Sequence, residues 1–145
     1  MNENNELLMH INETADMGVK STEKLLDLLK NKDNKIKFVL EEELKKYEEI
    51  LKESSKLLKK ANLEPKGASL MAEMMSKMEM KMDIKNDNSD SKVASILIQG
   101  FTMGTIEMNK KISDYEKQTD EKIIKLAKET LKFQELEIEK LKKFL

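Results

Sequence analysis

Apolar side chains recur at alternating three- and four-residue steps along most of this chain, and very little interrupts them. The 145 residues include one proline and four glycines, so the chain has little material for turns. Few turns require few and long elements, and the 3.6-residue period identifies these elements as helices. We expect four long helices, over residues 5–30, 34–61, 91–117 and 119–145, with Ser89 or Asp90 capping the third and Thr119 capping the last.

The connections between these helices predict how the chain is organised. Short turns join antiparallel neighbours, so residues 5–61 and 91–145 should form two helical hairpins within one domain. Residues 62–90 contain the only proline and should form a crossover with a short helix of their own. The sequence therefore predicts an all-α four-helix bundle in which the second and third long helices run parallel.

The two predicted hairpins have similar sequence patterns. A shift of about 86 residues brings Met17-Gly18 onto Met103-Gly104, and a shift of one more residue brings Tyr47 onto Gln134. The agreement is mostly one of apolar pattern, and the repeated Met-Gly on the buried stripe is its more specific part. We expect an internal duplication, with the hairpins related by a pseudo-two-fold axis.

Three glycines lie inside these predicted helices, at Gly18, Gly100 and Gly104. A glycine in a helix interior costs about 1 kcal/mol relative to alanine, so each position needs a reason. We expect close helix packing, or room for a bulky neighbour such as Tyr47. A hinge or a ligand pocket is the alternative.

Five segments carry a resemblance to a known fold family: ADMG at 15–18, EPKG at 64–67, IQGFTMG at 98–104, the stretch 107–115 and QELEIEKL at 134–141. On these segments the chain resembles an uncharacterised bacterial branch of the ferritin-like superfamily. The resemblance implies a bundle of two hairpins. It does not extend to the di-iron ligands, because the expected Glu-x-x-His pairs are replaced by Glu43-x-x-Lys46 and Gln134-x-x-Glu137.

The composition argues against binding to nucleic acid or to a membrane. The formal net charge is −1 and all 27 basic residues are lysine, so the arginine forks that read phosphate and guanine are missing. No apolar run approaches the length of a membrane span, and the N-terminal residues show no signal-peptide pattern. We expect a cytoplasmic protein that binds neither nucleic acid nor membrane.

The predicted crossover helix has the most unusual composition, because one of its faces is rich in methionine. Such a face suits a protein partner or a homodimer contact, since thioether side chains adapt to varied surfaces. A stripe packed against the bundle, or a Cu(I) site, is the alternative. The residues of this face are Met71, Met74, Met75, Met78 and Met82.

Polar side chains also fall on the predicted buried stripes. Tyr47 and Gln134 occupy equivalent repeat positions and are expected to meet as a buried polar pair, which either fixes the helix register or lines a pocket. Glu43 and Glu107 are the carboxylates expected nearest the interior. No residue is assigned a catalytic, cofactor or metal role.

These observations predict a non-enzymatic bundle that acts by protein binding or self-association. A degenerate ferritin-like protein that binds metal through carboxylates or methionines is the alternative.

Overall fold

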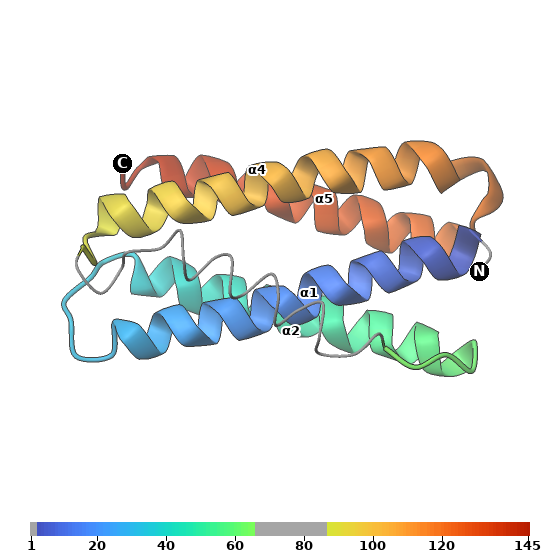
Figure 1. Cartoon of the computed structure of the whole chain (residues 1–145), viewed down its shortest axis with the longest axis horizontal. Coiled ribbons are helices and arrows are strands. Elements are labelled where there is room, and N and C mark those ends of the chain that lie inside the picture. Colours follow the sequence, from blue (N-terminus) through green and yellow to red (C-terminus); the bar gives the residue numbers. More distant parts are fainter. Residues whose placement is uncertain (1–2, 66–86) are drawn as a thin grey trace.

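The computed structural model describes residues 3–65 and 87–145, and the fold within these ranges is all-α, as predicted (Figure 1). It contains no strand in the described part of the chain. The helices are α1 (Glu3–Leu28), α2 (Lys37–Lys60), α4 (Asp90–Tyr115) and α5 (Glu121–Lys142), with a one-turn 3-10 helix η1 (Glu116–Gln118).

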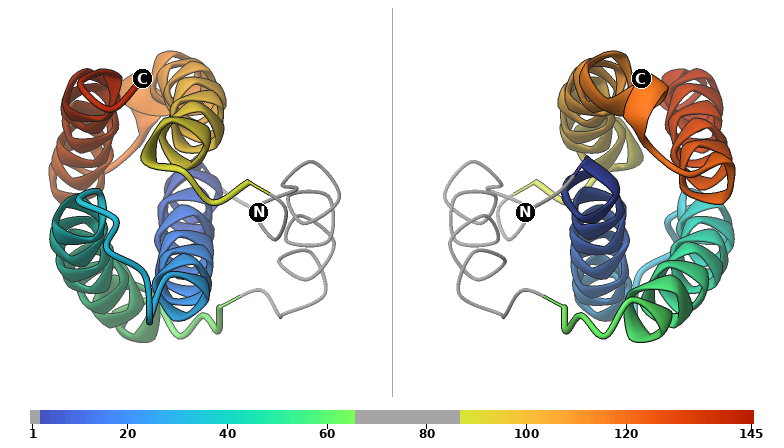
Figure 2. Two further views of the ribbon diagram at one scale, coloured as in Figure 1. Left: turned by 90° about the vertical axis from the view of Figure 1, so that its left-hand side faces the viewer. Right: turned by 90° about the vertical axis from the view of Figure 1, so that its right-hand side faces the viewer.

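The four helices form a bundle of two hairpins. In Figure 1, α1 runs antiparallel to α2, α4 runs antiparallel to α5, and α2 and α4 run in the same direction. Viewed along the bundle in Figure 2, the order around the ring is α1, α2, α5, α4. The parallel course of α2 and α4 means that the chain between them returns along the whole bundle, a distance of about 40 Å at 1.5 Å per residue.

The helix ends show where sequence reasoning succeeded and failed. Ser89 caps α4 by accepting a hydrogen bond from the Lys92 backbone N–H at 3.2 Å. The expected cap of α5 by Thr119 is wrong: Asp120 occupies the capping position, and the Thr119 hydroxyl has no hydrogen-bond partner. The Asp120 N–H instead donates to the Asn4 side chain of α1, at 2.7 Å.

The C-terminal end of α2 has a well-defined stop. Asn62 adopts a positive φ of 57°. Its N–H donates to the Lys59 carbonyl at 3.0 Å, and the Leu63 N–H donates to the Leu58 carbonyl at 2.9 Å. These two bonds form a Schellman motif, which satisfies carbonyls that the helix end leaves free.

Polar bonds join the two hairpins at the end of the bundle that holds the α1–α2 turn. Asn34 in that turn donates to the Asn88 carbonyl at 2.7 Å and to the Asp90 carboxylate at 2.9 Å. The first turn of α4 is thereby fixed to the first hairpin.

The core lies between the helices and draws apolar side chains from all four of them. Within the described ranges, no helix is long and apolar enough to cross a membrane. The expected crossover helix and its methionine face, Met71 to Met82, lie outside the described residues.

Candidate functional site

Two carboxyl groups are buried together in the bundle, on facing helices. Glu43 of α2 is 0% exposed and Glu137 of α5 is 2% exposed. Neither oxygen of Glu43, nor Oε1 of Glu137, has a hydrogen-bond partner among the described residues. Buried polar atoms are almost always paired, so this cluster is the main anomaly of the interior.

The environment favours the neutral form of Glu43. Burial, followed by the negative charge of Glu137, raises the pKa of the Glu43 carboxyl from 4.5 to about 9. Hydrogen bonding between the two carboxyl groups also contributes, since a proton on Glu43 supplies the donor that the pair otherwise lacks. At neutral pH Glu43 therefore holds its proton.

The exposed Lys140 binds Glu137, the outer carboxyl of the pair. Its Nζ lies 3.1 Å from Oε2 of Glu137. This hydrogen bond raises the pKa of Lys140. Glu137 and Lys140 line a groove between α2 and α5, whose other walls are Glu42, Lys45, Lys46, Glu49, Glu129, Lys132, Phe133 and Leu136.

Tyr47 lies one helical turn beyond Glu43 on α2 and touches three other helices. Its ring stacks on Phe101 of α4, with centroids 6.1 Å apart, and meets Phe133 of α5 edge-on at 5.1 Å. A Cβ on Gly18 of α1 would overlap the same ring. A glycine is therefore needed at position 18, where α1 approaches the ring. Burial is also the main reason that the pKa of Tyr47 is raised well above its usual value.

The same kind of contact occurs in the second hairpin. A Cβ on Gly104 of α4 would come 2.6 Å from Nε2 of Gln134 on α5. Gln134 is buried, but its Oε1 has no hydrogen-bond partner. The Tyr47 hydroxyl therefore does not donate to that oxygen.

Gly100 differs from the other two helical glycines. It is exposed, and a Cβ added there would meet no described residue within 4 Å. Close packing inside the described fold therefore does not explain Gly100, contrary to expectation.

Sequence analysis misplaced one candidate residue, Glu107, and missed another, Asn12. Glu107 is exposed, and the buried partner of Glu43 is Glu137. Asn12 was missed: it is buried in α1, and its Nδ2 donates to Ser54 at 3.0 Å and to Ser55 at 3.1 Å in α2.

A period-based signal could have found Glu137. A stripe of buried positions in α2 and another in α5 follow steps of three and four residues, and Glu137 falls on the second. The stripes consist of Leu40, Glu43, Tyr47, Ile50, Ser54 and Leu58 in α2, and of Ile123, Ala127, Thr130, Gln134, Glu137 and Leu141 in α5, where Leu126 and Phe133 are buried beside the stripe.

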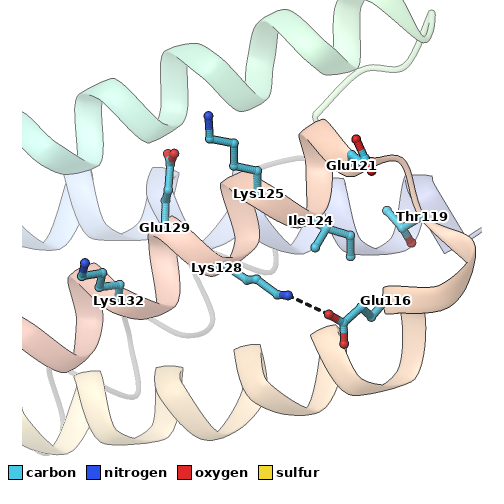
Figure 3. Close-up of a pocket in the computed structure, with 8 residues that line it drawn as sticks. All are labelled: Glu116, Thr119, Glu121, Ile124, Lys125, Lys128, Glu129 and Lys132. Atoms are coloured by element: carbon cyan, nitrogen blue, oxygen red, sulfur yellow. Dashed lines mark hydrogen bonds and ion pairs between the residues drawn. The ribbon is translucent and has the colours of Figure 1, made fainter.

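A second groove, of about 490 Å³, lies near the start of α5 (Figure 3). Three lysines and three glutamates line it, and Lys128 pairs with Glu116 at 2.7 Å. The opposite charges balance, so the groove has no excess charge with which to select an ionic ligand.

The outward face of α4 is uncharged over four turns. No charged residue occurs between Val93 and Ile106, in a chain with 38% charged residues. Met103 is 60% exposed and Ile106 is 64% exposed on this stretch. The outer faces of α2 and α5 are instead densely charged.

Metal ligands do not gather in the part of the chain that the structure describes. No group of three or more histidine, aspartate or glutamate side chains lies close enough there to hold an ion. His10 is partly buried, which lowers its pKa.

Comparison of the chain with protein-family models, with curated proteins and with solved structures found no match.

Proposed function

We propose that this protein is a non-enzymatic helical bundle that acts by protein binding, and first of all by self-association. The uncharged outward face of α4 carries this proposal. Exposed apolar residues that stand singly are ordinary, but a contiguous apolar face on an otherwise charged surface marks an interaction site.

The contrast with the other helices supports the proposal. On α5, the exposed Leu136 stands between Glu135 and Glu137, and charged residues continue on either side. On α4, Met103 and Ile106 belong to a stretch without charge that runs from Val93 to Ile106, and the first charged residue after it is Glu107. The expected methionine face of residues 71–82 would add a second apolar surface of the same kind.

Molar mass as a function of protein concentration tests self-association. We expect a reversible dimer for the full chain and a monomer for the double variant Met103→Gln/Ile106→Gln, with unchanged helicity. Leu136→Gln is the matched control, because it removes an exposed apolar side chain from another helix. A full chain that remains monomeric at millimolar concentration would remove the basis for self-association.

A second candidate function is cation binding in the core. The observation that favours it is the set of buried oxygens without hydrogen-bond donors, on Glu43, Glu137 and Gln134. Carboxylate and amide oxygens suit hard cations. A cation that binds the folded state raises the melting temperature, so we would compare the full chain with Glu43→Gln across Mg²⁺, Ca²⁺, Mn²⁺ and Fe²⁺. Equal shifts in both proteins would exclude this site.

We further propose that the fold is a ferritin-like bundle that arose by duplication, in a bacterial protein of the cytoplasm. The parallel α2 and α4 support the ferritin-like arrangement, in which one long connection crosses the bundle. The duplication is supported by the contacts of Gly18 with Tyr47 and of Gly104 with Gln134. These pairs occupy equivalent positions in the two hairpins.

A further inference from the structure

We propose that the partner on the outward face of α4 is a second copy of this chain, packed antiparallel about a two-fold axis between Gln99 and Gly100. This inference rests on the self-association proposed above and adds the register and orientation of the contact. Closed two-fold dimers are the commonest assemblies of identical chains.

The residues of this face lie within about a third of the helix circumference at 3.6 residues per turn. They point away from the buried side of α4, which holds Val93, Leu97, Phe101 and Met108. α4 stands at one corner of the bundle in the end-on views (Figure 2). The uncharged middle of the face consists of Ile96, Gln99, Gly100, Met103 and Ile106, and a charged residue borders it at either end, Lys92 and Glu107; all of these residues are half-exposed or exposed.

The sequence of this face is complementary to itself when it is reversed. Gln99 and Gly100 lie midway between Lys92 and Glu107, and also midway between Ile96 and Met103. An antiparallel two-fold contact therefore sets Lys92 against Glu107 of the second copy, and Ile96 against Met103 of the second copy. Both contacts occur twice. A parallel contact would set like charges against each other, which is unfavourable.

Gly100 fits the centre of such a contact. Glycine is disfavoured in a helix interior, and no described residue of the same chain lies near enough to require it. A glycine next to the axis lets two helix backbones approach closely. An antiparallel dimer thus explains the glycine at position 100, which contacts within one molecule do not explain.

Charge reversal and mixing test the register. Lys92→Glu alone sets two pairs of carboxylates against each other, and Glu107→Lys alone sets two pairs of ammonium groups against each other. We expect each single variant to dimerise about tenfold more weakly than the full chain, since exposed ion pairs contribute modestly. An equimolar mixture of the two variants restores opposite charges at both positions and should form a heterodimer.

Lys122→Glu and Glu135→Lys are the control reversals, because both residues are exposed on α5. They should leave the association unchanged, alone and mixed. The chain contains no cysteine, so a second measurement is available: Ile96→Cys and Met103→Cys chains should form a disulfide when mixed and far less of it when oxidised separately.

The outcomes separate this inference from the function it rests on. A full chain that dimerises, but whose single reversals neither weaken the dimer nor restore it on mixing, overturns the register and leaves self-association standing. A monomeric full chain overturns both. A monomer that unfolds more readily after Met103→Gln would show that this face is covered by the same chain, which also overturns the inference.

Discussion

The carboxyl of Glu43 lies against the carboxyl of Glu137 inside the bundle, and of the two, within residues 3–65 and 87–145, only Glu137 forms an ion pair with a lysine. Two carboxylates at this depth cannot both be charged without a large desolvation cost. The pair resolves this by keeping the inner carboxyl protonated, while Lys140 balances the outer one. A polar contact that links the two hairpins is thus sensitive to pH.

Stability should fall as the pH rises from about 5 to about 9. In this interval the folded chain holds a proton on Glu43 that the unfolded chain, with a carboxyl pKa near 4.5, has lost. Unfolding releases that proton, so the free energy of unfolding decreases by up to about 1.4 kcal/mol per pH unit. Urea unfolding at several pH values measures the slope, and Glu43→Gln should flatten it and raise stability at pH 8. An unchanged slope in Glu43→Gln would refute the assignment.

Gly18→Ala should destabilise the bundle. The new methyl group overlaps the Tyr47 ring, which is itself held between Phe101 and Phe133 and cannot retreat. Overpacking of this kind costs about 1–3 kcal/mol, measured as a lower melting temperature. Gly104→Ala is the comparison. It meets only the end of the flexible Gln134 side chain, so a loss as large as that of Gly18→Ala would contradict this explanation.

Gly100→Ala should have the opposite effect on the isolated chain. The added methyl group meets no described residue, and alanine is the better helix former, by about 1 kcal/mol at an exposed interior position. We expect a higher melting temperature at concentrations where the chain is monomeric. The same substitution should weaken the proposed dimer, so unfolding and molar mass should respond in opposite directions.

Asn12→Ala should destabilise the contact between α1 and α2. Asn12 donates to both Ser54 and Ser55, and removing the donor leaves the buried Ser54 hydroxyl without it. A cost of about 1–3 kcal/mol is expected. A double-mutant cycle with Ser54→Ala isolates the pairwise part, and a coupling energy near zero would show that Asn12 acts through packing alone.

The sequence was sufficient for the architecture, because periodicity and the scarcity of turn residues act over whole helices. The hairpins, the parallel α2 and α4, and the Ser89 cap follow from such local signals. Helix ends are set by single hydrogen bonds. The start of α5 shifted from the expected cap at Thr119 to Asp120, whose N–H is bound by Asn4 from the far end of the chain.

The site was harder to predict than the fold. Glu137 neighbours the apolar Ile138 on the helix, and hydrophobicity alone favours Ile138 for the interior. A buried glutamate is stable there only because Glu43 holds a proton and Lys140 lies within reach, and both conditions depend on tertiary structure. Asn12 was missed for the same reason, since its partners lie on another helix.

The position of the carboxyl pair also bears on how the chain folds. Each hairpin is built from contacts close in sequence, so each can form early and quickly. Glu43 meets Glu137 only when the two hairpins dock. Docking therefore takes up a proton at neutral pH, and the late step of folding should run faster in mildly acidic solution than in alkaline solution.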